Sequence, residues 1–513
     1  MHDRNDAQQH DRSLMRVLAM GTGINLGGVI VRVTVVFVHS LFAARLYGAT
    51  GYGHYTEGVA AVMLLSVITQ LGLGRALTRF VALFRAKGES SGVGYLLRLG
   101  LAVSLPLAVG AGFVMSFGSN QLAALFGGPS LVSAFRVFGL AVPFLVLATL
   151  LASFTQGFKD MRFKTIALDI VAPAVELAAM LLLAWFGAQK LGLSLAYTVS
   201  SVFAAVLLIH FARIDLRRAR TETVELRHYP TRTLLGPMMR FGVSVWVVEI
   251  LMEISRRASV LMLGIYGNSA MVGIFAIVQR LVGLGGIFLI STNLMFGPMV
   301  SDLVGRGQIG DLSRLHKTSA RWIFGISLPF FLLLSFYSSR ILAVFGLEFV
   351  IGSQALKYLV AGTLVDVSTG NSGIILMMSG RPQFNALNEV VRLLIIIGLN
   401  YLLIPQYGLV GAAWAIGLGT VVFSALQVAE TWWYLRVQPY SKSFLKVLIA
   451  GFFMIGLLWV CRAFVPTATT SWQWIVLSSG LALIGYVAVM VGSGLESEDK
   501  DILRAIRVRL LRF

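Results

Sequence analysis

The sequence predicts an all-α polytopic membrane protein of about 14 transmembrane helices, with two six-helix repeats followed by two C-terminal helices. Apolar residues make up 57% of the 513 positions, and the mean hydropathy is +0.81. Charged residues make up only 13%, which is about half of their usual share in soluble domains. Apolar stretches of about 20 residues, the length that crosses a bilayer, recur along the whole chain.

These stretches define the expected helices, and a polar segment separates the first six from the rest. The first six span residues 17–38, 55–74, 94–117, 136–157, 166–187 and 193–212, and the others span 237–262, 271–298, 319–338, 356–379, 387–404, 409–434, 444–465 and 472–494.

The two groups of six helices are related by an internal repeat. Tyr47-Gly48 recurs 219 positions later as Tyr266-Gly267, and Leu125–Gly127 recurs at the same spacing as Val344–Gly346. A duplicated membrane unit of this size is the usual architecture of a secondary transporter, in which two halves rock about a central site.

Six segments follow from the apolar stretches and the repeat. We expect a cytoplasmic N-tail (1–16), an N-terminal six-helix lobe (17–212), a cytoplasmic linker (213–236), a C-terminal six-helix lobe (237–434), an extra helix pair (435–495) and a basic amphipathic C-tail (496–513) on the membrane surface.

The distribution of lysine and arginine predicts the orientation. If both termini are cytoplasmic, the inner segments hold 31 of the 42 basic residues and the outer segments hold six. This asymmetry satisfies the positive-inside rule. The net charge of +19 does not indicate a nucleic-acid partner, because the charges lie in short runs between apolar spans.

The sequence lacks the motifs that are typical of several enzyme classes. The chain contains no Walker loop, no HExxH motif and no Cys/His cluster, and Cys461 is its single cysteine. The expected outer loops are short, which disfavours a polymerase or ligase with an extracellular catalytic domain. We therefore expect neither an enzyme nor a metal or organic cofactor.

Four motifs carry a resemblance to a known family. They are Ala44–Gly48 (Ala-Arg-Leu-Tyr-Gly), Gln70–Phe80, Gly157–Phe163 and Gly408–Ala412. Their order and spacing resemble the polysaccharide flippases (Wzx-type, for O-antigen and exopolysaccharide) of the multidrug/oligosaccharidyl-lipid/polysaccharide exporter superfamily.

The resemblance implies a V-shaped twelve-helix core in which helices 1, 2, 7 and 8 line a central cavity. It also implies export of a polyprenyl-diphosphate-linked oligosaccharide by alternating access across the bacterial inner membrane, for lipopolysaccharide or exopolysaccharide synthesis. The implied partners are this lipid-linked substrate, membrane lipids, a polysaccharide polymerase and glycosyltransferases. A cation-coupled multidrug exporter and a membrane polymerase or glycosyltransferase remain the alternatives.

Four arginines inside apolar spans are the candidate substrate ligands. Arg32 lies 16 residues after Arg16, about 24 Å along a helix, and Arg280 lies near the middle of the expected helix 8. Arg256 and Arg257 lie in the outer half of the expected helix 7. A permanently charged guanidinium binds phosphate in a fork geometry. Alternatively, Arg32 and Arg257 pair with acids or extend to the surface.

Acidic residues inside the spans are candidates for gating and charge pairing. Glu253 precedes Arg256 by three residues and Arg257 by four, so the three side chains can share one helix face. Glu249 lies one turn earlier on the same helix, and Glu57 is a further candidate for balancing an arginine. A static internal ion pair is the alternative to a gate.

Asp366 is the candidate ion-coupling residue. It lies near the middle of the expected helix 10, and the nearest basic residues in sequence, Lys357 and Arg381, lie near the span ends. A carboxylate among hydroxyl groups can bind H⁺ or Na⁺. The family resemblance extends this coupling role to Glu253, whereas polar packing without coupling is the alternative.

Overall fold

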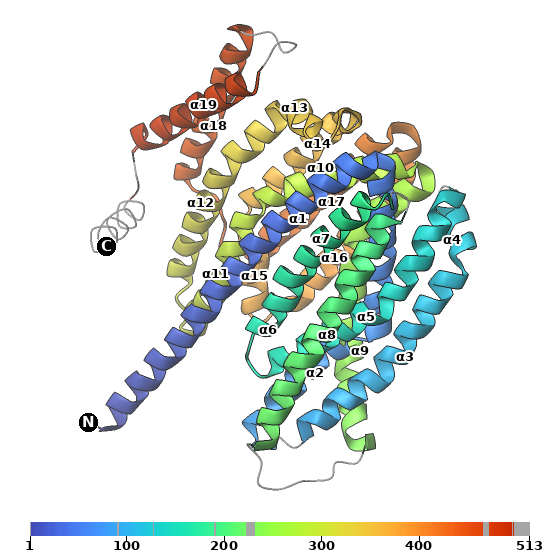
Figure 1. Cartoon of the computed structure of the whole chain (residues 1–513). Helices are drawn as coiled ribbons and strands as arrows, with labels where there is room; N and C mark the ends of the chain where they lie inside the picture. The colour runs from blue at the N-terminus through green and yellow to red at the C-terminus, as the bar shows by residue number, and fades with distance from the viewer. Residues whose placement is uncertain are drawn as a thin grey trace. The chain divides into compact units, whose positions relative to one another are not determined.

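The computed structural model describes residues 2–89, 92–126, 128–188, 191–221, 231–464, 471–494 and 496, and contains helices but no strand within these ranges. The chain divides into two compact units, which we call unit 1 (up to Ile277) and unit 2 (from Val278). Figure 1 shows the helices of both units.

Unit 1 contains the following elements. They are α1 (His2–Gln70), α2 (Leu73–Ala86), α3 (Val93–Phe117), α4 (Ser119–Leu125), the 3₁₀-helix η2 (Pro129–Leu131), α5 (Val132–Gly157), α6 (Arg162–Lys164), the π-helix η3 (Thr165–Val171), α7 (Ala172–Trp185), α8 (Gly192–Thr221) and α9 (Thr231–Tyr266).

Unit 2 contains the remaining elements, and α10 (Ser269–Gly285) contains the boundary between the units. They are α11 (Ile287–Gly305), α12 (Ile309–Phe336), α13 (Ser338–Ala343), the 3₁₀-helix η4 (Leu347–Gly352), α14 (Ser353–Ser368), α15 (Ser372–Met378), α16 (Pro382–Tyr407), α17 (Leu409–Leu435), α18 (Lys442–Phe464) and α19 (Trp472–Gly492).

Helix α5 is the centre of unit 1. It packs against α1, α2, α3 and α8, and Figure 1 shows α3 and α8 alongside it. Its side chains are apolar around the whole circumference, and Phe135, Phe138 and Phe154 are fully buried. A helix without a polar face can be buried on all sides, which explains its central position. In unit 2, α17 packs against α14 and α16, and α12 against α14 and α18.

The first two expected spans are continuous in the structure except at one residue. Gly48 has φ 68° and ψ 180°, and it breaks α1 within a segment that the sequence analysis treated as a loop. Glycine reaches positive φ without a steric penalty, so one residue redirects the chain where a loop was expected.

The structure confirms the predicted all-α polytopic fold. Twelve helices in the described residues are long and apolar enough to cross a membrane, and one of them, Val31–Gln70, contains the break at Gly48. The expected span 271–298 corresponds to α10 and α11, which are separated at Gly286.

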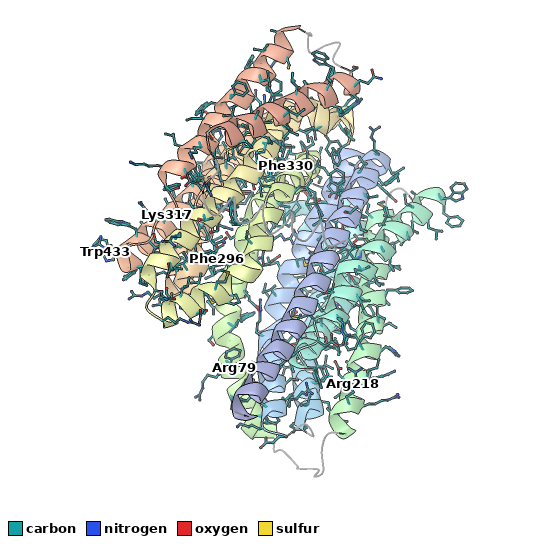
Figure 2. All side chains as sticks on the ribbon, turned by 90° about the vertical axis from the view of Figure 1, so that its left-hand side faces the viewer. Arg79, Arg218, Phe296, Lys317, Phe330 and Trp433 are labelled. Atoms are coloured by element: carbon teal, nitrogen blue, oxygen red, sulfur yellow. The ribbon has the colours of Figure 1, made fainter. Side chains whose placement is uncertain are left out.

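The outward surface is strongly apolar. Phe117 of α3, Trp185 of α7 and Trp433 of α17 are 71%, 87% and 72% exposed, and Figure 2 shows Trp433 projecting from unit 2. Soluble monomers rarely expose so many large apolar side chains, whereas acyl chains solvate such a surface. At one end of unit 1 the labelled side chains are instead Arg79 and Arg218 (Figure 2).

The predicted segment boundaries are not tested by this division into units. Helix α9, which the sequence assigns to the second repeat, packs against α1 and α2 of unit 1. The two units are defined by packing, whereas the six segments are defined by the sequence repeat and the apolar stretches. The units therefore do not test the segments, which stay predictions. The predicted linker 213–236 contains the ends of α8 and α9, and residues 222–230, like the C-tail beyond Glu496, lie outside the described residues.

A close approach of α1 and α10 gives a first prediction. A Cβ added at Gly53 would lie 1.7 Å from the carbonyl oxygen of Ser269. We expect Gly53→Ala to separate these helices and lower the free energy of unfolding by about 1–3 kcal/mol, measured by thermal unfolding in detergent. Gly110→Ala is the matched control, because no atom lies within 4 Å of its added Cβ. Equal stability of the two variants would contradict this packing.

Candidate functional site

One carboxylate on α9 binds two of the predicted arginines. Glu253 Oε2 accepts hydrogen bonds from Arg256 Nη2 at 2.6 Å and Nε at 3.1 Å, and Glu253 Oε1 accepts one from Arg257 Nε at 2.9 Å. The Glu253 side chain is only 7% exposed, whereas those of Arg256 and Arg257 are 56% and 29% exposed. The spacing therefore brings the three charges together, with one net positive charge and unused N–H donors.

Glu249 does not join this group. Its Oε1 accepts a hydrogen bond from Arg75 Nε of α2 at 3.0 Å, and both side chains are partly exposed. Such a surface ion pair contributes about 0–1 kcal/mol. Its main effect is to link α2 to α9, and its predicted role in gating stays a prediction.

Arg32 has an acidic partner, Asp169, from another part of unit 1. Arg32 Nη1 lies 3.0 Å from Asp169 Oδ1 of η3, and the Arg32 side chain is 58% exposed. This geometry corresponds to the pairing alternative for Arg32. A bonded and exposed guanidinium still presents donors to a ligand, so the arrangement does not test the ligand role.

Arg280 differs from the other three arginines. It lies half-buried on α10, and no hydrogen bond or ion pair joins it to any residue of unit 2 whose side chain the structure describes. Its full set of donors is therefore available within that part of the chain.

Glu57 lies deep inside unit 1 without an arginine partner among the described residues. Its side chain is fully buried, and Oε2 accepts a hydrogen bond from Ser269 Oγ at 3.0 Å. Oε1 has no hydrogen-bond partner in the described part of the chain. In this structure Glu57 binds a serine hydroxyl, and its balancing of an arginine stays a prediction.

Asp366 has a basic neighbour from another helix. Asp366 Oδ1 accepts a hydrogen bond from Ser424 Oγ of α17 at 2.7 Å, and Arg392 of α16 interacts with it electrostatically. Arg392 Nη2 also lies 3.4 Å from Glu389 Oε1. The carboxylate is therefore less isolated than its sequence neighbours Lys357 and Arg381 indicated.

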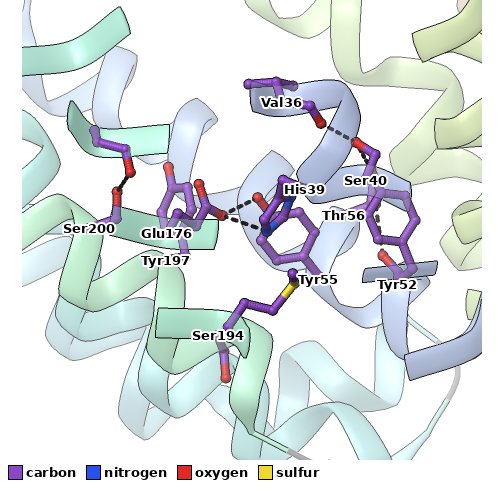
Figure 3. A network of polar contacts seen from close by, with 12 residues as sticks. Val36, His39, Ser40, Tyr52, Tyr55, Thr56, Glu176, Ser194, Tyr197 and Ser200 are labelled. Atoms are coloured by element: carbon purple, nitrogen blue, oxygen red, sulfur yellow. Dashed lines mark hydrogen bonds and ion pairs between the residues drawn. The ribbon is translucent and has the colours of Figure 1, made fainter. Parts of the chain in front are cut away.

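A second polar cluster in unit 1 was not identified from the sequence. We call His39, Tyr55, Glu176 and Tyr197 the histidine–glutamate cluster (Figure 3). Glu176 Oε1 lies 3.6 Å from His39 Nε2 and accepts a short hydrogen bond from the Tyr55 hydroxyl. The Tyr197 hydroxyl is buried and has no hydrogen-bond partner among the described residues.

This cluster is close to the arginines of α9. Arg257 and Glu253 both interact electrostatically with Tyr197, as does Glu176. Tyr55 also lines a cavity of about 440 Å³ together with Tyr47, His54 and Ser194. The sequence signal for the cluster was Glu176 inside an expected span, with His39 directly after the first span, because buried ionisable residues in a membrane usually face a partner or a cavity.

The sequence profile of one family, described as "Polysaccharide biosynthesis protein", matches residues 18–304. The chain belongs to this family. The match confirms the family predicted from the motifs and covers Arg32, Glu57, Glu253, Arg256, Arg257 and Arg280. It ends before Asp366. No curated protein sequence matches the chain.

Solved structures give the fold of this family member. The lipid II flippase MurJ in an inward closed conformation is similar with a TM-score of 0.70 at 13% identity, over 92% of this chain and 98% of MurJ. An inward-facing multidrug resistance MATE transporter of the MOP superfamily has a TM-score of 0.62 at 15% identity, over 78% and 98%. A MOP superfamily transporter from Pyrococcus furiosus has a TM-score of 0.58 at 15% identity, over 82% and 95%.

Proposed function

We propose that the protein is a flippase that moves a polyprenyl-diphosphate-linked oligosaccharide from the inner to the outer leaflet for surface polysaccharide synthesis. The observation that carries the proposal is the set of arginines inside apolar helices of a segment that matches a polysaccharide biosynthesis family. The similarity to the fold of a lipid II flippase supports the same conclusion.

The chemistry of the substrate explains why arginines would be needed. A lipid diphosphate keeps its negative charge, and hydrocarbon offers it no hydrogen-bond donors. An arginine near the centre of a membrane helix costs roughly 2.5–3.5 kcal/mol, so its presence calls for a ligand, a partner or a hydrated cavity. Arg280 has no described partner in its unit, and Arg256 and Arg257 keep donors beyond those bound to Glu253. Each of these side chains is a proposed ligand for the diphosphate or for anionic sugars.

The proposed location is the bacterial inner membrane with both termini in the cytoplasm. The proposal rests on the asymmetry of lysine and arginine between alternate loops. In this orientation the substrate is loaded where cytoplasmic glycosyltransferases complete it, and released where a polymerase extends the glycan.

The proposed energy source is an H⁺ or Na⁺ gradient that acts through Asp366. Glu253 is the weaker candidate for this role, because its two guanidinium partners would repel a bound cation. Asp366 has a hydroxyl donor and one electrostatic interaction with an arginine, so it is better placed to exchange a cation.

Two alternative functions make different demands on the chain. Export of a small cationic drug would favour carboxylates and aromatic side chains at the binding site, whereas the predicted ligands here are arginines. A membrane polymerase or glycosyltransferase would need a catalytic domain, and the connections between described helices of the family segment are short.

Reconstitution would test the proposed function directly. The full-length protein would be incorporated into liposomes with a fluorescent polyprenyl-diphosphate oligosaccharide, with and without an imposed H⁺ or Na⁺ gradient. We expect the glycan to become accessible to an impermeant lectin much faster than in protein-free liposomes. No acceleration with several glycans, combined with gradient-driven export of a cationic dye, would favour the multidrug exporter instead.

Asp366→Asn is expected to separate coupling from folding. Asparagine retains an oxygen that accepts the hydrogen bond from Ser424 Oγ, but it cannot carry the charge that a cation requires. We expect the stimulation of flipping by the gradient to fall about tenfold, the effect of losing about 1.4 kcal/mol, while thermal stability is retained. Ser424→Ala is the matched control for the hydrogen bond alone. An unchanged gradient response in Asp366→Asn would exclude coupling through this residue.

A further inference from the structure

Helix α12 presents a row of basic side chains near its N-terminus. Arg314, Lys317 and Arg321 follow one another at intervals of three and four residues, so they lie along one face of the helix. Helix α12 packs against α18. Lys317 is labelled on α12 in Figure 2.

These side chains line a small polar cavity inside unit 2. Its volume is about 150 Å³, and it is lined by Arg314, Lys317, Arg321, Thr318, Ser441, Ser443 and Glu496. All lining residues except Glu496 carry a cationic or hydroxyl group that can donate hydrogen bonds. We call it the α12–α18 pocket.

The backbone adds further positive potential to the α12–α18 pocket. Helix α18 begins at Lys442, and Ser441 and Ser443 flank this start. The first amide groups of a helix lack internal acceptors and carry a partial positive charge, so a helix N-terminus favours an anion. The pocket thus combines fixed cations, hydroxyl donors and a helix N-terminus.

An internal anion already occupies part of the pocket. Glu496 Oε1 accepts a hydrogen bond from Ser443 Oγ at 2.6 Å and another from Lys446 Nζ at 3.1 Å. These bonds hold the pKa of Glu496 below its usual value, and Lys446 and Arg321 attract its charge. The pocket therefore stabilises a carboxylate. Arg314 Nη1 also lies 4.0 Å from Asp311 Oδ1. The four basic residues Arg314, Lys317, Arg321 and Lys446 thus have the acidic residues Glu496 and Asp311 near them.

The surroundings of the pocket indicate the headgroup region of a bilayer. Helix α17 ends at Leu435 with the exposed residues Trp432, Trp433 and Tyr434, and aromatic side chains of this kind are enriched at membrane–water interfaces. The pocket residue Ser441 follows six positions after this helix end.

An apolar stripe leads away from the pocket along α18. Leu445, Ile449 and Phe452 are 58%, 53% and 71% exposed. Their spacing of four and three residues places them on one face of the helix. Ile449 follows Lys446 by three residues, and Lys446 Nζ binds the pocket residue Glu496. The stripe therefore runs beside Lys446, and a molecule with a phosphate in the pocket could lay its acyl chains along this face of α18.

We propose that the α12–α18 pocket binds the phosphate of an anionic phospholipid, with Glu496 as an internal carboxylate that the phosphate displaces. Arg314, Lys317 and Arg321 contact the phosphate, and Ser441 and Ser443 donate to its oxygens. A free phosphate ion has the same headgroup chemistry, but it would leave the apolar stripe on α18 without a ligand. The site lies in unit 2 outside the segment that matches the family profile, and it does not depend on the proposed flippase activity.

Lipid-dependent thermal stability would test this site. The full-length protein in detergent would be titrated with phosphatidylglycerol, phosphatidylcholine or inorganic phosphate. We expect phosphatidylglycerol alone to raise the melting temperature of the wild type. The double variant Arg314→Gln/Lys317→Gln should bind phosphatidylglycerol at least tenfold more weakly, because a basic residue near an anionic lipid contributes about 1 kcal/mol.

Two further variants make the test specific. Glu496→Gln should bind phosphatidylglycerol several-fold more tightly than the wild type, because the competing charge is gone. Arg213→Gln/Arg217→Gln removes the same charge from the exposed end of α8 and should leave the response unchanged. The proposal would be overturned by an equal response of the Arg314/Lys317 variant and the wild type, by equal stabilisation with inorganic phosphate, or by an unchanged affinity of Glu496→Gln.

Discussion

Replacing Arg280 with alanine is expected to lower the rate of oligosaccharide flipping in liposomes by at least tenfold while the protein stays folded. Hydrogen bonds to charged groups contribute about 1.5–3 kcal/mol, and about 1.4 kcal/mol corresponds to a tenfold change in rate. The fold should tolerate the change, because Arg280 has no hydrogen bond or ion pair with the described side chains of its unit. Its loss therefore removes a group that is available to a ligand.

Two control variants distinguish a ligand role from a general effect of charge. Arg280→Lys keeps the charge but loses the planar fork that binds two phosphate oxygens, so we expect an intermediate rate. Arg306→Ala removes an exposed arginine whose Nε lies 2.9 Å from Asp302 Oδ1, and it should flip substrate at the wild-type rate. If Arg280→Ala retained full activity, the proposed diphosphate site would have to be moved to another residue.

The fold was predictable because its cause is local. A run of apolar residues long enough to cross a bilayer specifies a helix wherever it occurs, since the hydrocarbon region leaves no other way to satisfy the backbone. What the composition could not predict was the break at Gly48, where a single positive φ value replaces the expected loop. The composition did not predict the separation of α10 from α11 at Gly286 either.

The predictable part of the candidate site was also local. Glu253 and its two arginines share one helix, so their spacing alone was enough to predict the contact. The partners of Arg32 and Asp366 come from other helices. Asp169, the partner of Arg32, is 137 residues away in sequence, and Ser424, the partner of Asp366, is 58 residues away. A single sequence does not specify which polar residues of two apolar helices will meet.

The histidine–glutamate cluster illustrates the same limit. His39 directly follows the first expected span and Glu176 lies inside the fifth, but helices α1 and α7 bring them together only after packing. Glu249 lies one turn before Glu253, and its carboxylate binds Arg75 of another helix, while its gating role stays a prediction. Residues four apart on one helix share a face, but the side chains of neighbouring helices decide which partner each of them binds.

Glu253→Gln is expected to lower both the substrate concentration at half-maximal flipping and the maximal rate. The Glu253 carboxylate binds N–H groups of Arg256 and Arg257 that a substrate diphosphate would also use. Without this competitor the substrate should bind several-fold more tightly. Release of the substrate should become slower, because no carboxylate competes with it for the guanidinium groups. Tighter binding of the ground state does not accelerate a transport step, so the maximal rate should fall.

A double-mutant cycle would measure how strongly Glu253 interacts with each arginine. We expect a coupling energy of about 1.5 kcal/mol with Arg257, since hydrogen bonds to charged groups contribute about 1.5–3 kcal/mol, and less than about 1 kcal/mol with the more exposed Arg256. Unfolding of Glu253→Gln, Arg257→Gln, Arg256→Gln and the two double variants would give these values. A static ion pair predicts the same coupling energies but no change in the half-saturating substrate concentration. The combination of the two measurements therefore separates a gate, in which the carboxylate competes with the substrate, from a contact that only stabilises α9.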